Sequence, residues 1–494
     1  MTLSNISDAN LVLAAEDFDR DDFKQLHKFS KNDERVIGKL VAHGPVLLQG
    51  SRGSGKSALM LEAASRLEPG QQDAPAVGVY LSLRHMPLLR SAGDVYQRIL
   101  CELLIERVSR LLTGTPHVFD ASPTLASVQA ALTDLSLASE KRLVLMFDDA
   151  AHIGREASLA DFFDVFRTLS SNTVSCKATI YPGVTNFGNR FDVYNDATVV
   201  DVVRDEDQAG FAGLFADVTK ARFPELADRR FASDLTLEDF AAFVGKSVLG
   251  NMRSFIFVCN SIMGTEDGSV GLAALTKSFL EMTTNFYWPL IEEVKPKLGK
   301  YLPVVDPAKE VAEALLTECG RQQSTSVIVH RDIISRLSKA FEILEYVGFI
   351  SRRESSKAMK SGGRGSRYAV NLCMLLEKIA GSRLTSEVYQ HLKGSTEEPI
   401  QIHSKGTVLA NVAMPELTEG AQPEILVHPI ESIRKSPAYP YGLSERMLEK
   451  LHEATIDTVG NLYDAPEEAL DAIPYIGEYR VRQLKNIVAQ AIWL

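Results

Sequence analysis

The sequence lacks the features that place a chain across or outside a membrane. It has only five cysteines among 494 residues, with no C-x-x-C pair, so neither a disulfide framework nor a cysteine zinc site is expected. No apolar stretch is long enough to cross a bilayer, and the N-terminus MTLSNISDAN lacks the basic start of a secretory signal. These absences predict a cytoplasmic protein with no membrane partner.

Net positive charge is also lacking. The formal net charge of −11 argues against general electrostatic attraction to nucleic acid, although it permits a local basic patch. The sequence contains no Asn-Lys-x-Asp box of the kind that specifies guanine. At this length, about three or four domains are expected.

One octet matches a phosphate-binding loop in full. Residues 50–57 read GSRGSGKS, between an apolar run at 45–49 and a helical pattern at 58–64, which is the strand-loop-helix context that the motif requires. Loop amides at the helix N-terminus can surround a polyphosphate, Lys56 can bind its outer phosphates, and the Ser57 hydroxyl can coordinate Mg²⁺. We therefore expect ATP and Mg²⁺ to be bound by Gly50, Ser51, Arg52, Gly53, Ser54, Gly55, Lys56 and Ser57.

A second motif supplies acids to the same site. The apolar run 143–147 ends in Asp148 and Asp149. A buried strand can hold Asp148 at the metal, while Asp149 orients or deprotonates the attacking water. Because aspartate is shorter than the glutamate often found at the second position, slow hydrolysis is expected.

Alternating patterns divide the chain into regions. Strands expected at 77–83, 143–147, 178–181 and 198–203, separated by helices, predict an α/β fold with a buried parallel sheet and a P-loop ATPase core. The predicted regions are an N-terminal extension (1–28), the core (29–205), a helical lid (206–300), a winged-helix domain (301–385), a linker with a small β element near 400–402 (386–440), and a compact helical domain (441–494), for which a resemblance given below implies a helix-hairpin-helix fold.

The predicted winged helix carries a local basic patch. Two short β-runs, 348–353 and 368–371, flank a glycine-containing loop at 355–366. Such a cationic loop can follow the backbone of duplex DNA without reading bases, and the alternative is a hairpin tip used for autoinhibition or protein docking. Against the single acid Glu354, the candidate DNA contacts are Arg352, Arg353, Lys357, Lys360, Arg364 and Arg367.

Four motifs in this order resemble those of AAA+ ATPases, in particular the origin-recognition initiators and the signal-transduction ATPases with numerous domains. They are GSRGSGKS, LVLMFDD at 143–149, TIYPGVTN at 179–186 and GNMR at 250–253, and the resemblance spans about residues 30–385. It implies that Asn186 is the sensor-1 residue and Arg253 the sensor-2 arginine, acting with Lys56 and Asp149. Arg190 lies where an arginine finger would serve a neighbouring subunit of a homo-oligomer, and a surface arginine is the alternative.

The segment from Gly442 resembles the helix-hairpin-helix C-terminal domain of the bacterial RNA polymerase α subunit. Arg446 matches a DNA-contacting arginine of that module, whereas Glu449 and Glu478 are acids where polar or basic residues are expected. Either DNA or a protein partner is therefore expected there. The resemblances together imply an ATP-binding and hydrolysing AAA+-type ATPase that acts as a nucleotide-dependent DNA-binding switch. The alternatives are a signalling ATPase, for example in host defence, that recruits a protein effector without DNA, and a nucleotide-binding subunit that never hydrolyses.

Overall fold

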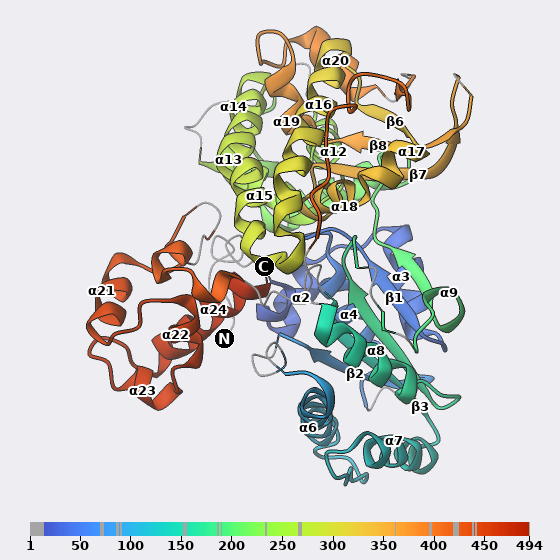
Figure 1. The fold of residues 1–494 in the computed structure, drawn as a ribbon, viewed down its shortest axis with the longest axis vertical. Helices are drawn as coiled ribbons and strands as arrows, with labels where there is room; N and C mark the ends of the chain where they lie inside the picture. The colour runs from blue at the N-terminus through green and yellow to red at the C-terminus, as the bar shows by residue number, and fades with distance from the viewer. Residues whose placement is uncertain are drawn as a thin grey trace.

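The computed structural model describes residues 14–69, 74–84, 88, 91–151, 156–184, 187–188, 190–232, 235–264, 269–360, 362–394, 398–417, 424–436, 439 and 442–493. Figure 1 shows a sheet-containing part, a larger mainly helical part beside it, and a smaller helical module near the C-terminus. Within these ranges, no helix combines the length and the apolar character that a membrane crossing requires. All five cysteines are buried free thiols.

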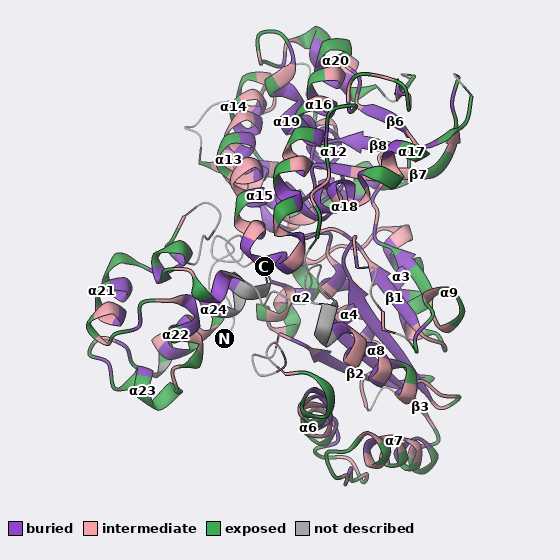
Figure 2. Cartoon of the chain, viewed as in Figure 1, coloured by how far each residue is buried: buried purple, intermediate pink, exposed green. Residues whose placement is uncertain are grey.

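The sheet-containing part confirms the predicted α/β P-loop fold. Its five strands lie in the order β2-β3-β4-β1-β5 and all neighbours are parallel. Figure 2 shows the central strands as buried. The strands are β1 (Val46–Gln49), β2 (Ala76–Ser82), β3 (Arg142–Ala151), β4 (Val174–Ile180) and β5 (Thr198–Asp201).

Side-chain alternation along β3 explains where its acidic end points. Leu143, Leu145 and Phe147 pack with α6 (Gly93–Leu111), α7 (Leu125–Ser139) and α8 (Glu156–Leu169) on one face of the sheet. Val144 and Met146 pack with α3 (Lys31–Val41) and α4 (Lys56–Ser65) on the other. Because successive side chains of a strand alternate between faces, the next even position, Asp148, lies on the α4 side.

The short helix α9 (Val193–Asp196) comes directly before β5, and a helical region follows β5. Its buried apolar residues belong to one hydrophobic core that continues into the next region of the chain. Near the other end of the chain, the turn η1 (Ala15–Asp17) and α2 (Arg20–Leu26) precede α3. The helices after β5 are α10 (Phe211–Arg222), α11 (Pro224–Ala227), α12 (Leu237–Ser247), α13 (Met252–Met263), α14 (Leu272–Met282) and α15 (Trp288–Val294).

A second sheet has the strand order β7-β8-β6-β9. The elements run α16 (Val305–Gln322), β6 (Ser326–His330), α17 (Arg331–Arg336), α18 (Ser338–Val347), β7 (Ile350–Ala358), β8 (Arg364–Val370), α19 (Leu372–Lys378), α20 (Ser386–Lys393) and β9 (Ile400–Ile402). The prediction of a long loop at 355–366 is wrong, because Lys357 pairs with Gly365 and Ala358 with Arg364 in the antiparallel hairpin. The short β-run expected near 400–402 is present as β9, parallel to β6.

The C-terminal module has a hydrophobic core of its own. Its helices are α21 (Glu445–Glu453), α22 (Val459–Asp464), α23 (Glu467–Asp471) and α24 (Glu478–Trp493). The amphipathic pattern of α21 buries Met447, Leu448 and Leu451 in this core.

Candidate nucleotide-binding site

The GSRGSGKS octet joins β1 to α4, as the motif requires. Gly53 and Gly55 have φ of 76° and 91°, in the left-handed region that favours glycine. A Cβ at Gly53 would also approach the Cβ of Arg253 to 2.6 Å, so glycine is needed for α13 to reach the loop. The Arg253 amide donates to the Gly53 carbonyl at 3.2 Å. The sequence-predicted loop and GNMR motif therefore meet.

Lys56 is a buried cation whose direct contacts, among the described residues, are with neutral groups. Its Nζ donates to the carbonyls of Gly50 at 2.7 Å and Ser51 at 3.0 Å, and lies 3.7 Å from the centroid of the Tyr181 ring. Burial lowers the pKa of Lys56 to about 7, although the nearby Asp149 and Asp148 oppose that shift. An anionic ligand beside Nζ would restore the charged form.

Asp148 is fully buried and held from several sides. Its carboxylate accepts hydrogen bonds from the Tyr80 hydroxyl at 2.7 Å and the Thr179 hydroxyl at 2.8 Å. Burial and the neighbouring Asp149 raise the pKa of Asp148, while hydrogen bonds from Ser57 and Tyr80 lower it. The two side chains expected to hold a metal, Ser57 and Asp148, are therefore in contact.

Asp149 occupies a left-handed backbone position, with φ of 53°. Its carboxylate accepts a hydrogen bond from Arg84 Nε at 2.5 Å and another from the Tyr181 hydroxyl at 3.2 Å. Arg84 Nη1 also lies 3.7 Å from a carboxylate oxygen of Glu16. Sequence reasoning missed Arg84, Tyr181 and Glu16, which come from three separate segments. Arg84 and Glu16 carry no motif, and Tyr181 lies within TIYPGVTN but was given no role.

The cavity beside the loop has a volume of about 100 Å³ and one strongly basic side. Apolar side chains including Phe29, Val218 and Ile256 line another part of it. Among its described lining residues the only acid is Glu16, against the seven basic residues Lys28, Arg52, Lys56, Arg84, Arg204, Arg222 and Arg253. Such a lining suits an anionic ligand with an apolar portion.

Arg253 lies in the first turn of α13 and faces the loop. Burial and the neighbouring Arg52 lower its pKa to about 10, and its buried Nε has no hydrogen-bond partner among the described residues. The two other polar residues implied by the resemblance differ in placement. Arg190 is a largely exposed side chain 4.0 Å from Asp164, and Asn186 lies outside the described residues.

Arg52 joins the loop to elements of the helical part. Its amide donates to the Tyr346 carbonyl at 3.1 Å, and its guanidinium lies 3.7 Å from Glu293 of α15, with both side chains buried. Glu293 also pairs with Lys297 at 2.6 Å. The phosphate-binding loop is therefore connected to α15 and α18 through one P-loop side chain and its backbone.

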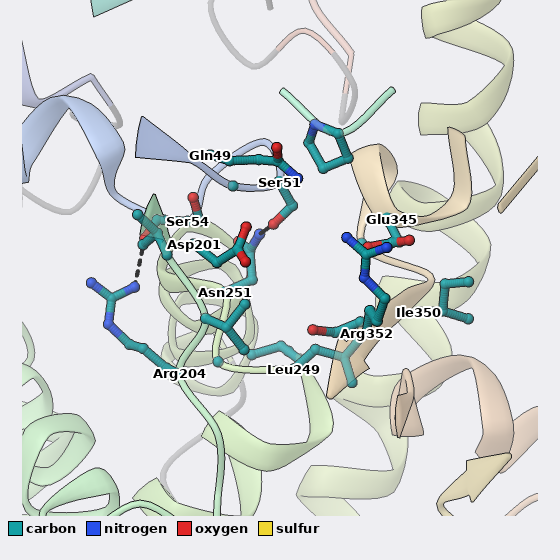
Figure 3. Close-up of a pocket in the computed structure, with 18 residues that line it drawn as sticks. Gln49, Ser51, Ser54, Asp201, Arg204, Leu249, Asn251, Glu345, Ile350 and Arg352 are labelled. Atoms are coloured by element: carbon teal, nitrogen blue, oxygen red, sulfur yellow. Dashed lines mark hydrogen bonds between the residues drawn. The ribbon is translucent and has the colours of Figure 1, made fainter. Parts of the chain in front are cut away.

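A second cavity lies where the core, the helical region and the hairpin meet. Figure 3 shows Arg352 beside Glu345, with Asp201, Ser54 and Arg204 around the same pocket. Burial raises the pKa of Glu345 to about 7, although Arg352 opposes the shift.

This raised pKa predicts a pH-dependent stability. Because the folded Glu345 keeps its proton at higher pH than the unfolded chain does, the free energy of unfolding should fall as pH rises from about 4.5 to about 7. We expect a loss of about 1–3 kcal/mol over this window, on the order of 1.4 kcal/mol per pKa unit. Glu345→Gln should remove this share of the pH dependence and leave that of Glu16, whose pKa burial also raises to about 7. The exposed Glu387→Gln should leave both, in thermal unfolding at pH 4.5 and 8.

The basic residues of the hairpin have varied surroundings. Arg353 is buried and pairs with Glu206 at 2.8 Å, in the segment that leads from β5 to α10. Three other cations pair with acids, Lys357 and Arg367 with Glu354, and Lys360 with Glu398. Arg364 instead donates to the hydroxyl and carbonyl of Ser356, at 2.5 and 2.9 Å. Arg352, near the start of β7, is also exposed and lies beside Glu345, whereas the exposed Lys360 and Arg364 lie toward the hairpin tip.

The parallel sheet and its glycine-rich loop define a P-loop α/β fold. No protein-family model matches the chain, and no curated protein does either. Among solved structures, the Walker-type ATPase PABY2304 of Pyrococcus abyssi is 15% identical with a TM-score of 0.41, and the match covers 73% of this chain and 95% of that one. The Aeropyrum pernix ORC2 protein, solved in ADPNP-ADP complexes, is 11% identical with a TM-score of 0.39, covering 76% and 98%. Drosophila ORC bound to DNA is 12% identical with a TM-score of 0.32, covering 75% and 90%. At these TM-scores the similarities assign neither a family nor an activity.

Proposed function

We propose that this chain binds ATP with Mg²⁺ and hydrolyses the β-γ bond, as an AAA+-type ATPase. The observation that carries the proposal is that Ser57, which lines the basic cavity together with Lys56, contacts the fully buried Asp148, so that a complete phosphate-binding loop meets the end of a buried parallel strand. A P-loop that served only as a surface turn would not need a fully buried carboxylate in contact with its serine.

The residues present fit a divalent cation. Oxygen atoms of Glu16, Asp148 and Asp149 lie within 4.8 Å of one another, and the carboxylate oxygens of Glu16 are buried without hydrogen-bond partners among the described residues. Ser57 and Asp148 would hold Mg²⁺, which when bound supplies positive charge to the phosphates.

The protein's own groups have separable tasks in this proposal. Lys56 and the loop amides bind the outer phosphates and stabilise charge that develops on them. Asp149 orients the attacking water, and Arg84 and Tyr181 hold that carboxylate in place. Arg253 reaches the same cavity from α13 and would contact the terminal phosphate, so nucleotide state would be communicated to the helical region.

Titration of the intact protein with a fluorescent ATP analogue, with Mg²⁺ and with EDTA, tests this proposal directly. Saturable binding that Mg²⁺ strengthens, together with phosphate release from ATP, is expected. Absence of saturable binding by folded protein would refute nucleotide recognition, whereas binding without phosphate release would leave a nucleotide-binding subunit that does not hydrolyse.

We further propose that the chain acts as a nucleotide-dependent DNA-binding switch. The element order α16-β6-α17-α18-β7-β8 supports a winged helix here, and the accessible cations near its hairpin tip are Lys357, Lys360 and Arg364. The ion pair of Arg353 with Glu206 supports a different task for that residue, which is to hold the hairpin against the core.

Removing the tip cations is expected to weaken DNA binding. The variant Lys357→Ala/Lys360→Ala/Arg364→Ala should have a lower affinity for duplex DNA, and the slope of log affinity against log salt should fall by about 0.9 for each DNA phosphate that the variant no longer neutralises. Arg110→Ala, which removes an exposed arginine of α6, serves as the control. Fluorescence anisotropy at several salt concentrations measures both quantities, and an unchanged salt slope in the triple variant would contradict a role of the tip in DNA binding.

A signalling ATPase that recruits a protein effector is the second candidate. It is favoured by the pairing of four of the six hairpin cations with acids. If the intact protein binds ATP but does not bind duplex DNA at low ionic strength, this second function is supported over the first.

A further inference from the structure

The segment before α2 reaches into the proposed metal site. Its turn η1 packs against α4, and Glu16 lines the same cavity as Lys56 and Ser57. Both carboxylate oxygens of Glu16 are shielded from solvent and accept no hydrogen bond within the described part of the chain. A buried carboxylate with no donor is unfavourable unless a proton, a ligand or a cation compensates it, and burial raises the pKa of Glu16 to about 7.

The surroundings of Glu16 leave its charge poorly neutralised. Asp148 and Asp149 each place a carboxylate oxygen within 4.8 Å of an oxygen of Glu16. The cation paired with Glu16 is Arg84, whose Nη1 is 3.7 Å away, beyond hydrogen-bond distance. The stronger contact of Arg84 is with Asp149, at 2.5 Å. One guanidinium therefore faces two carboxylates and satisfies only one of them.

The spacing of these oxygens suits a small cation. Around Mg²⁺, with metal-oxygen distances of about 2.1 Å, neighbouring ligand oxygens lie about 3 Å apart and opposite ones about 4 Å apart. The three carboxylate oxygens would need to approach only slightly to share one coordination shell. Ser57 and Asp148 are already in contact at this point.

Asp149 is less suited than Glu16 to move toward a cation. Two donors, Arg84 and Tyr181, hold its carboxylate, and its backbone has a left-handed φ of 53°. Glu16 has a longer side chain, and its carboxylate has no hydrogen bond to break within the described part of the chain.

We propose that Glu16 is a third protein ligand of the divalent cation, beside Ser57 and Asp148, so that the N-terminal segment completes the metal site. This inference rests on the proposed function for the identity of the cation and its nucleotide. It goes beyond that function because nothing in the phosphate-binding loop or the acidic strand requires a ligand from this segment.

Manganese titration of the intact protein, followed by electron paramagnetic resonance of free Mn²⁺, tests the proposal without relying on turnover. We expect Glu16→Gln to raise the Kd for Mn²⁺ about tenfold or more, with Mn²⁺ alone and with a non-hydrolysable ATP analogue. Glu16→Asp, which keeps the charge on a shorter side chain, should give an intermediate Kd. Asp17→Asn removes the adjacent acid, which is not one of the three clustered carboxylates, and should change the Kd less than twofold.

Each outcome decides between this role and a purely structural one. If Glu16 serves only as a partner of Arg84, Glu16→Gln leaves the Mn²⁺ Kd unchanged, and that result overturns the proposal. Tighter Mn²⁺ binding by Glu16→Gln, or no Mn²⁺ binding by the parent protein, overturns it as well. If Glu16→Gln weakens Mn²⁺ binding but no protein binds the ATP analogue, the metal role stands and the proposed ATPase function fails. If the proteins bind the ATP analogue normally and Glu16→Gln leaves the Mn²⁺ Kd unaltered, the nucleotide-binding proposal stands and the metal role of Glu16 fails. Thermal unfolding of each variant confirms that the comparison is between folded proteins.

Discussion

Replacing Lys56 by methionine is expected to lower the affinity for MgATP by about 100-fold or more. Truncating a buried, hydrogen-bonded charge that faces an opposite charge costs about 2–5 kcal/mol, and each 1.4 kcal/mol is tenfold in affinity. Lys56 is 5% exposed, and within the described ranges its Nζ donates to two loop carbonyls and lies over a ring, with no hydrogen bond to a carboxylate. A triphosphate would therefore be its principal anionic partner.

The same substitution should not unfold the protein. Because burial already lowers the pKa of Lys56 to about 7, the charge itself contributes little to the stability of the nucleotide-free fold. Methionine has a similar length and no charge, so the unfolding midpoint should remain close to that of the parent. Lys56→Arg is the matched control, because it keeps the positive charge but replaces the compact ammonium by a planar guanidinium of different shape. Calorimetric titration with MgATP measures the effect, and retention of parental affinity by Lys56→Met would contradict the role of the loop.

Local sequence was sufficient to predict which motifs meet at the centre of the candidate site. The loop, β1 and α4 are contiguous, and the acids follow an apolar strand, so neighbouring residues alone specify Lys56, Ser57 and Asp148. The side chains around them could not be predicted, because Tyr80, Thr179 and Arg84 come from strands or strand ends whose order in the sheet no local pattern specifies. The polar groups of Tyr80 and Thr179 within predicted strands were the available signal, since such groups need a buried partner.

For the basic hairpin, the sequence predicted the charged residues but not the acids with which they pair. The sequence predicted its charge and its two strands, but the distribution of that charge depends on partners far along the chain. Arg353 pairs with Glu206, and Lys360 pairs with Glu398 beyond the hairpin. The glycine-containing sequence at 355–366 predicted a loop, whereas cross-strand pairing, including the Ser366 hydroxyl donating to the Ser355 carbonyl at 2.9 Å, extends the strands.

Loss of the buried Arg204, which no motif marked, should strongly weaken the core. Its guanidinium pairs with Asp33 of α3 at 2.9 Å and donates to the Ser54 carbonyl of the phosphate-binding loop at 2.5 Å. The two ionic side chains are only 6% and 3% exposed. Arg204→Met would leave the Asp33 carboxylate buried without its cation, and breaking such a pair costs about 3–5 kcal/mol.

A nearby exposed pair provides the matched comparison. Arg66 of α4 pairs with Glu34, the residue next to Asp33, at 2.8 Å, and these side chains are 39% and 47% exposed. Arg66→Met should therefore cost less than about 1 kcal/mol. Because a chain of this size need not unfold in one step, hydrogen exchange of α3 and α4 peptides across a urea series should report the core separately from the C-terminal module. The double variant Asp33→Asn/Arg204→Met also removes the unpaired buried carboxylate, so it should recover part of the free energy of unfolding lost in Arg204→Met. Equal destabilisation by Arg204→Met and Arg66→Met would show that burial does not set the strength of this contact.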